Sequence, residues 1–197
     1  MIISIGRQHG SSGREIARLL AKELGIKCYD KEIVDEAAKH SDLSRDLISA
    51  YDEKRMSTFM LQSGGYGIGE TYRINMHVAA AQFDAMREIA SRGDCIFVGR
   101  CADYILREYR DQLVSVFILG DMDERLKCLA RRQGLDEAAA RRKIKEVDKD
   151  RASFYRYYSD QVWGDAQNYD LCINSSRLGV EGTVKVIMDY IKTRGLR

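Results

Sequence analysis

Short, continuous apolar runs alternate along the chain with longer segments in which apolar residues recur at the spacing of a helix face. Continuous apolar runs are typical of strands that are buried on both faces of a sheet. The pattern therefore predicts five strands, at residues 1–5, 26–29, 95–98, 113–119 and 169–174.

Helical spacing fills most of the chain between these runs. The predicted helices cover residues 14–24, 31–40, 44–55, 70–92, 122–132, 136–158 and 180–191. Strands that alternate with helices indicate an α/β fold with a five-stranded parallel sheet covered on both faces, and such folds bind ligands at the carboxyl ends of the strands. The glycine-rich segment "QSGGYGIG" (62–69) is predicted to be a loop, either an ordinary one or one that serves as a hinge or faces a substrate.

Length and composition narrow the class of protein. A chain of 197 residues with 45% hydrophobic and 31% charged content fits one globular domain. Because 32 basic residues face 30 acidic ones, the net charge of +2 gives no indication of nucleic-acid binding. The start "MIISIG" lacks the basic segment of a signal peptide and no apolar stretch is long enough to cross a membrane, so we expect a cytoplasmic protein. The five cysteines form no CxxC pair and the three histidines are far apart, so no metal site is predicted.

The residues between the first predicted strand and the first predicted helix have the composition of a phosphate-binding loop. The loop lies in "SIGRQHGSSGREIARLLAKELG" (4–25), and its central residues are Gly10, Ser11, Ser12 and Gly13. Glycines allow successive backbone N–H groups to point at one anion, and a helix N-terminus adds about half a positive charge there. Arg14 adds a guanidinium whose planar fork suits phosphate. The alternative is a tight strand-to-helix turn that binds nothing.

The match to the P-loop motif GxxxxGK[ST] is ambiguous by one residue. If Arg14 takes the lysine position, Glu15 takes the position of the Ser or Thr that usually holds magnesium. If Ser12 takes the position of the last glycine, Gly13 takes that of the lysine. Either alignment lacks the lysine, so the sequence predicts a phosphate cradle with an altered cation.

The same glycines leave a dinucleotide-binding alternative open. Glycines at positions 6, 10 and 13 follow the first strand, and Asp30 ends the second, where an acidic residue would hold a ribose. Dehydrogenases with this glycine spacing use a Tyr-x-x-x-Lys pair, and none of the 11 tyrosines is followed by lysine at that distance. The sequence therefore favours a phosphate cradle over an oxidoreductase site.

Four segments together resemble one family. They are "SIGRQHGSSGREIA" (4–17), "CIFVGRCADYIL" (95–106), "IKEVDKDRASFY" (144–155) and "YDLCINSSRLG" (169–179). In this order they resemble the cytidylate kinase-like proteins, which are relatives of bacterial cytidylate kinase within the P-loop nucleoside monophosphate kinases. The resemblance implies a three-layer α/β/α P-loop NTPase fold over residues 1–197 as a single domain. It also implies a helical monophosphate-binding insert at 31–93 and a lid region at 136–166.

The resemblance assigns roles to residues that follow two of the strands. Arg100 takes the place of the arginine that grips the monophosphate, although Val98 and Cys101 stand where the kinases have acidic residues. Asp103 is a candidate substitute for those acids, and Asp30 matches the start of the monophosphate-binding region. The alternatives are a surface arginine for Arg100, a carboxylate favoured by a helix dipole for Asp103, and a helix cap for Asp30.

The lid assignment rests on "DKDR" (148–151), which resembles the Asp-x-x-Arg of the kinase lid. The resemblance implies that Arg151 stabilises the transferring phosphoryl group and that Asp148 orients an arginine or the phosphates. Other lid arginines of the kinases fall on Ile144 and Val147 here. Basic residues that either replace them or form a solvated helix face are Arg141, Arg142, Lys145, Lys149 and Arg156.

The resemblance implies transfer of a phosphoryl group from ATP to a nucleoside monophosphate, with CMP or dCMP favoured as the acceptor. Arg14, Asp148 and Arg151 are the expected catalytic residues, and Mg²⁺ is expected to be held mainly through the ATP phosphates. The residues expected to bind nucleotides are Gly10, Ser11, Ser12, Gly13, Arg14, Glu15, Asp30, Arg100 and Asp103. The partners are therefore nucleotides, with no nucleic acid and no membrane, and the oligomeric state stays open, a homodimer included. The lost lysine keeps one alternative open, a nucleotide-binding sensor with little transferase activity.

Overall fold

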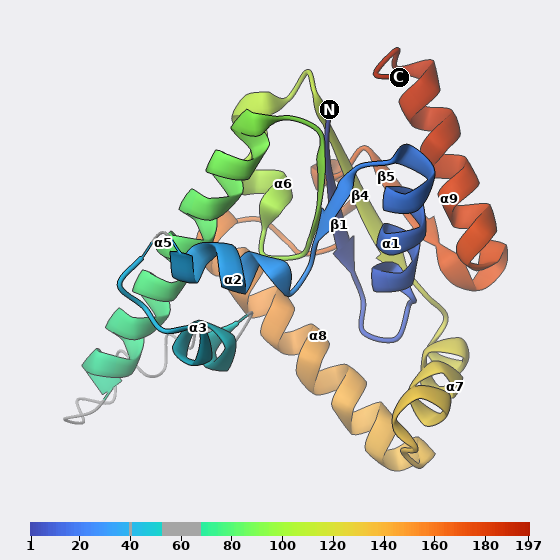
Figure 1. Cartoon of the computed structure of the whole chain (residues 1–197). Helices are drawn as coiled ribbons and strands as arrows, with labels where there is room; N and C mark the ends of the chain where they lie inside the picture. The colour runs from blue at the N-terminus through green and yellow to red at the C-terminus, as the bar shows by residue number, and fades with distance from the viewer. Residues whose placement is uncertain (40, 53–67) are drawn as a thin grey trace.

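A parallel sheet forms the centre of the molecule, and a computed structural model describes residues 1–39, 41–52 and 68–197 around it (Figure 1). The strands are β1 (Ile2–Arg7), β2 (Lys27–Tyr29), β3 (Cys95–Val98), β4 (Leu113–Leu119) and β5 (Leu171–Asn174). Their order in the sheet is β2-β3-β1-β4-β5, and each neighbouring pair is parallel. The predicted α/β class with a five-stranded parallel sheet is confirmed.

Helices cover both faces of this sheet. They are α1 (Gly13–Leu24), α2 (Glu32–Lys39), α3 (Arg45–Tyr51), α5 (Ile68–Arg92), α6 (Ala102–Ile105), α7 (Met122–Gln133), α8 (Glu137–Ser159) and α9 (Ser175–Thr193). Short 3₁₀ turns occupy Arg107–Tyr109 and Ala166–Asn168. Residues 62–67 of the predicted glycine-rich loop, together with the end of the helix predicted at 44–55, lie outside the described residues.

The two faces of the sheet bury separate apolar clusters. Side chains of β1 alternate between them, so that Ile3 and Ile5 pack with α1 and α9 while Ile2 packs with α5 and α6. Every residue of β1 is buried, because this central strand has a neighbour on each side and helices above and below. This buried position in the sheet explains why the sequence of the strand begins with a continuous apolar run.

Two helical regions flank the carboxyl ends of the strands (Figure 1). Helices α2, α3 and α5 occupy the predicted insert at 31–93, and α2 packs on both α3 and α5. Helices α7 and α8 pack on each other, and α8 fills most of the predicted lid region at 136–166. Within the described ranges, no helix combines the length and the hydropathy needed to span a membrane.

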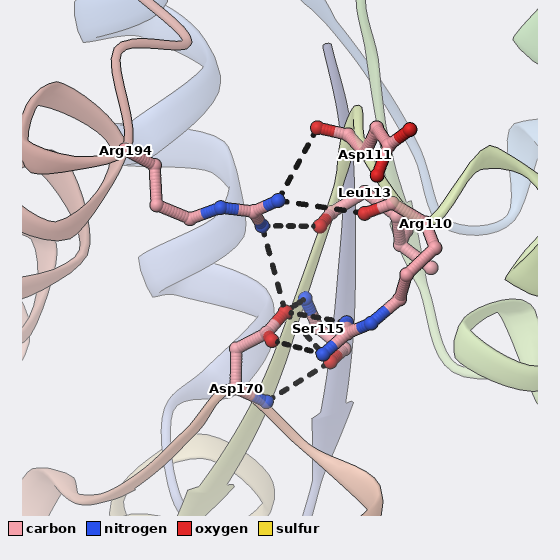
Figure 2. Close-up of polar contacts among 6 residues, drawn as sticks. All are labelled: Arg110, Asp111, Leu113, Ser115, Asp170 and Arg194. Carbon is pink, nitrogen blue, oxygen red and sulfur yellow. Dashed lines mark hydrogen bonds and ion pairs between the residues drawn. The ribbon is translucent and has the colours of Figure 1, made fainter.

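A buried carboxylate ties together the opposite, amino-terminal end of β4 and β5 (Figure 2). Asp170 precedes β5 and accepts hydrogen bonds from the backbone N–H of Ser115 at 2.8 Å and from its hydroxyl at 3.0 Å. Arg110 donates to both oxygens of the same carboxylate, at 3.2 and 2.7 Å. Arg194, just after α9, lies 3.9 Å from Asp170 and donates to the carbonyl of Leu113 at 2.7 Å. One carboxylate therefore joins a strand, a loop and the last helix.

These hydrogen bonds favour the ionised form of Asp170. Burial by itself raises the pKa of this carboxyl, but the donors from Arg110 and Ser115 outweigh burial, and the pKa is lowered. A carboxylate with a lowered pKa stabilises the folded state at neutral pH, and this contribution is lost as the pH falls through the acid range.

We expect Asp170→Asn to lower the free energy of unfolding at pH 7 by about 1–3 kcal/mol, because it removes a charged acceptor from several donors. Urea unfolding followed by circular dichroism measures this change. Arg110→Gln should cost less, about 1 kcal/mol or below, because the Arg110 side chain is 62% exposed. Asp84→Asn, at a carboxylate that is 75% exposed, is the control. Equal effects of all three substitutions would contradict the central role of Asp170.

Candidate active site

The loop between β1 and α1, which is predicted to bind phosphate, contains two residues in the left-handed region. Gly10 has a φ of 85° and Ser12 a φ of 57°, both in the left-handed region. A Cβ atom at Gly10 would lie 2.9 Å from the Arg125 carbonyl oxygen and 2.9 Å from Leu129 of α7. Glycine is therefore favoured at position 10 for two reasons. The backbone φ is positive there, and the loop packs too closely against α7 to admit a Cβ atom.

Side chains inside the loop fix its shape. The Ser11 hydroxyl is buried and lies 2.9 Å from the Gln8 carbonyl oxygen and 3.2 Å from that of Ile118. The side-chain oxygen of Gln8 accepts from the backbone N–H of Gly120 at 3.0 Å. Ser11, predicted to bind nucleotide, therefore uses its hydroxyl to hold the loop against β4, and its backbone N–H donates to the Gln8 carbonyl at 3.4 Å.

Arginines surround a pocket of about 160 Å³ above this loop. Loop residues Gly10, Ser12 and Gly13 form its floor, where α1 begins. The guanidinium-bearing residues that line it are Arg7, Arg14, Arg132 and Arg151. Four arginines around a helix N-terminus make this pocket suited to a polyanion.

The predicted cation Arg14 is paired with the predicted acid Asp30. Its Nη2 donates to Asp30 at 3.3 Å, and its Nε forms an ion pair with the same carboxylate. Asp30 is buried at the end of β2, whereas 43% of the Arg14 side chain is exposed. Glu15 points elsewhere and forms an ion pair with Arg132 of α7. The structure thus brings Asp30 to the phosphate loop through Arg14.

Helix α8 is bonded directly to the phosphate loop. Asp148 accepts a hydrogen bond from the backbone N–H of His9 at 2.7 Å and forms an ion pair with Arg125. Arg125 also donates to the His9 carbonyl at 2.7 Å, and Arg151 donates to the Arg7 carbonyl at 3.0 Å. Arg125 is 4% exposed. Sequence reasoning missed this residue, because it is one of several basic residues on α7 and its partners are distant in the sequence.

His9 is kept neutral by its surroundings. Burial lowers its pKa most, and the charges of Arg151, Arg125, Lys143 and Arg7 lower it further, to about 4. At neutral pH the imidazole therefore carries no charge. The cationic character of the pocket comes from its arginines.

Arg100 is buried and bidentately bound, which rules out the surface alternative. It follows β3 in the left-handed region with a φ of 54° and is 4% exposed. Its Nε and Nη2 donate to the two carboxylate oxygens of Asp52 at 2.8 and 2.5 Å, and its Nη1 donates to the Val98 carbonyl at 3.1 Å. Gln82 of α5 donates to Asp52 at 3.2 Å. Sequence reasoning missed Asp52 and Gln82, since neither lies in a recognisable motif.

A second, narrower pocket of about 20 Å³ lies between Arg100 and α8. Asp103 and Tyr155 both line it, and the Tyr155 hydroxyl donates to Asp103 at 2.6 Å. Arg151 lines this pocket as well as the pocket above the phosphate loop. The predicted residues Arg100, Asp103 and Arg151 therefore meet, and they adjoin the loop.

Burial raises the pKa of Asp103 to about 6, even though the hydrogen bond from Tyr155 and backbone donors act in the opposite direction. This carboxyl therefore reaches its midpoint of ionisation near pH 6 and is mostly ionised at pH 7.

The chain is similar over nearly its whole length to known proteins. Residues 2–177 match the model of the Cytidylate kinase-like family. The cytidylate kinase of Methanopyrus kandleri is 25% identical over 95% of this chain and 91% of its own length. That of Aeropyrum pernix is 27% identical over 95% of this chain and 96% of its own.

Solved structures agree on the fold. An uncharacterized protein from Eubacterium ventriosum superposes with a TM-score of 0.74 at 29% identity, over 98% of each chain. The shikimate kinase of Bacteroides thetaiotaomicron superposes with a TM-score of 0.57 at 15% identity, also over 98% of each chain. At that identity the kinase shows the fold alone, which is the P-loop kinase fold.

We expect the free energy of unfolding of Asp103→Asn to increase relative to that of the wild type as the pH rises. A carboxyl whose pKa is raised by folding costs stability once the pH passes through the window from about 4 to about 6, and asparagine carries no such cost. Between pH 4.5 and pH 7.5, the difference in unfolding free energy should shift by about 1–2 kcal/mol in favour of the variant. Urea unfolding at both pH values measures it, with Asp84→Asn as the exposed control. A pH-independent difference would contradict the assignment.

Proposed function

The chain belongs to the cytidylate kinase-like family, and we propose that it transfers the γ-phosphoryl group of ATP to a nucleoside monophosphate, with CMP or dCMP favoured. The observation that carries the proposal is that the arginine-lined pocket on the loop after β1 adjoins the buried Arg100 at the end of β3. The narrow space of about 20 Å³ beside Arg100 lies between this arginine and α8. Donor and acceptor phosphates need this arrangement for direct transfer. Because the chain belongs to this family, we do not propose a dinucleotide-dependent oxidoreductase.

The donor would lie on the loop from Gly10 to Gly13, with its phosphates at the N-terminus of α1 and beside Arg14. A further pocket of about 180 Å³ shares Gly10, Ser12 and Cys128 with the phosphate pocket and continues toward the start of α9. Ser176 and Gly179 line it there. We assign the nucleoside part of ATP to this continuation.

The proposal includes Mg²⁺ that is bound mainly through the ATP phosphates. Within the described residues, no group of three or more His, Cys, Asp and Glu side chains is placed to hold a metal ion. The carboxylates of Glu15, Asp30 and Asp148 are each paired with an arginine. The ion would therefore be held through the β- and γ-phosphates, whose charge it reduces.

The acceptor monophosphate would bind Arg100, with its attacking oxygen facing the γ-phosphate. That oxygen forms the new bond to phosphorus as the bond to the β–γ bridging oxygen breaks, and ADP leaves with the electron pair. The chain contributes positioning and positive charge, chiefly through Arg14 and Arg151. Asp148 holds α8 on the loop, which supports a role for residues 136–166 as a lid that excludes water.

One observation favours a second candidate, a nucleotide-binding sensor with little transferase activity. In one of the two alignments Arg14 takes the position of the P-loop lysine, and its guanidinium is engaged by Asp30. A cation held by a neighbouring carboxylate is less available to the phosphates than a free ammonium group.

We expect ADP release from ATP and Mg²⁺ to depend on CMP or dCMP in a coupled assay that screens each nucleoside monophosphate. Arg14→Ala should lower kcat/KM for ATP by roughly tenfold or more, because it removes a charge from the donor phosphates. Arg87→Gln, at an exposed ion pair on α5, is the matched control. ATP binding without acceptor-dependent turnover would favour the sensor. Absence of ATP binding would reject both candidates.

We also expect Asp52→Asn to lower KM for the acceptor by roughly three- to tenfold, with a smaller effect on kcat. The acceptor phosphate has to compete with the Asp52 carboxylate for the same two donors of Arg100, and an amide is a weaker competitor. Initial rates at varied acceptor concentration measure the effect. A higher KM would show that Asp52 instead supports the binding-competent position of Arg100.

A further inference from the structure

Arg7 occupies the boundary between the two pockets. It is the last residue of β1 and lines both the pocket above the phosphate loop and the narrower pocket beside Arg100. Arg151 is the other arginine that lines both pockets, and its guanidinium donates to the Arg7 carbonyl at 3.0 Å. A group that passes from one pocket to the other would pass these two arginines.

The first residue of α1 packs directly against the Arg7 side chain. A Cβ atom at Gly13 would lie 2.6 Å from the Cβ of Arg7 and 3.0 Å from its Cγ. Real Cβ atoms do not approach so closely, so only glycine lets the helix N-terminus lie on this arginine. The second glycine of "GSSG" therefore makes room for Arg7.

Arg7 is also more firmly placed than Arg14. Arg7 is 6% exposed, whereas 43% of the Arg14 side chain is exposed. Arg14 lines the phosphate pocket and forms its ion pair with Asp30 at the end of β2. A buried arginine on a central strand has fewer conformations to lose when it binds a phosphoryl group.

We propose that Arg7 is a catalytic residue that contacts the transferred phosphoryl group and fills the role left open by the missing P-loop lysine. The assignment rests on the proposed function. As the acceptor oxygen bonds to the γ-phosphorus and ADP departs, Arg7 and Arg151 face the equatorial oxygens of the phosphoryl group from the boundary of the two pockets.

The test compares Arg7→Gln, Arg7→Lys and the surface control Arg87→Gln by calorimetric binding of ATP and of ADP, without acceptor. Because Arg7 faces the γ-phosphate, Arg7→Gln should weaken ATP binding about tenfold or more and change ADP binding less than about twofold. With acceptor present, its kcat should fall by roughly 10²–10³-fold. Arg7→Lys keeps the charge but loses the fork, so ATP should still bind better than ADP, with kcat lowered by about tenfold.

The possible outcomes separate the role of Arg7 from the proposed phosphoryl transfer. Equal losses for ATP and ADP, or no loss, would overturn the role of Arg7 and leave the proposed function standing. Selective loss of ATP binding in a protein without acceptor turnover would reject the proposed transfer and retain the contact with the γ-phosphate. Absence of ATP binding by the wild type would reject both. If Arg7→Gln does not fold, an unchanged kcat in Arg7→Lys overturns the proposal.

Discussion

The site depends on carboxylates that pair with guanidinium groups gathered around one pocket and its neighbour. Two like charges about 4 Å apart repel by about 1–4 kcal/mol, depending on exposure to water. Carboxylates offset this repulsion, and each comes from a different part of the chain. They are Asp30 for Arg14, Asp52 for Arg100 and Asp148 for Arg125. These pairs join the end of β2 to α1, the end of α3 to the end of β3, and α8 to α7. The same contacts therefore balance the charges and position the helical regions.

Backbone strain is concentrated at the same place. The turns after β1 and β3 both contain a glycine with positive φ followed within two residues by a non-glycine residue in the left-handed region. Ser12, Arg100 and Cys101 adopt this conformation, which costs about 1 kcal/mol or more for each side chain with a Cβ. The strained turns start α1 and α6 directly at the strand ends, and they aim the loop amides and Arg100 toward the same edge of the sheet.

The sequence predicts the parts of this structure that are local. Central parallel strands are continuous apolar runs, and Gly10 marks a turn whose φ few other residues adopt, so both are visible in the pattern. Long-range pairing is not visible. Asp52 lies 48 positions before Arg100, and the sequence shows two charged residues without showing that they meet. The pattern does not single out Arg7 either, because the predicted strand ends at residue 5 whereas β1 extends to Arg7, and the place of this side chain depends on its contact with Gly13.

The contact between Arg7 and Gly13 is also the basis on which we propose that a strand residue supplies the cation in place of the P-loop lysine. A lysine at the start of the helix reaches its phosphates from the helix itself, and the strand before it needs no charge. Here β1 ends in Arg7, and α1 begins with Gly13, which has no side chain. The proposed cation is therefore carried by the strand and not by the first residue of the helix. In the proposed arrangement the charge stands on a buried central strand, where the side chain has fewer conformations to lose than it would at the surface. The same side chain lines the narrow pocket beside Arg100, so one residue of β1 serves both halves of the proposed site.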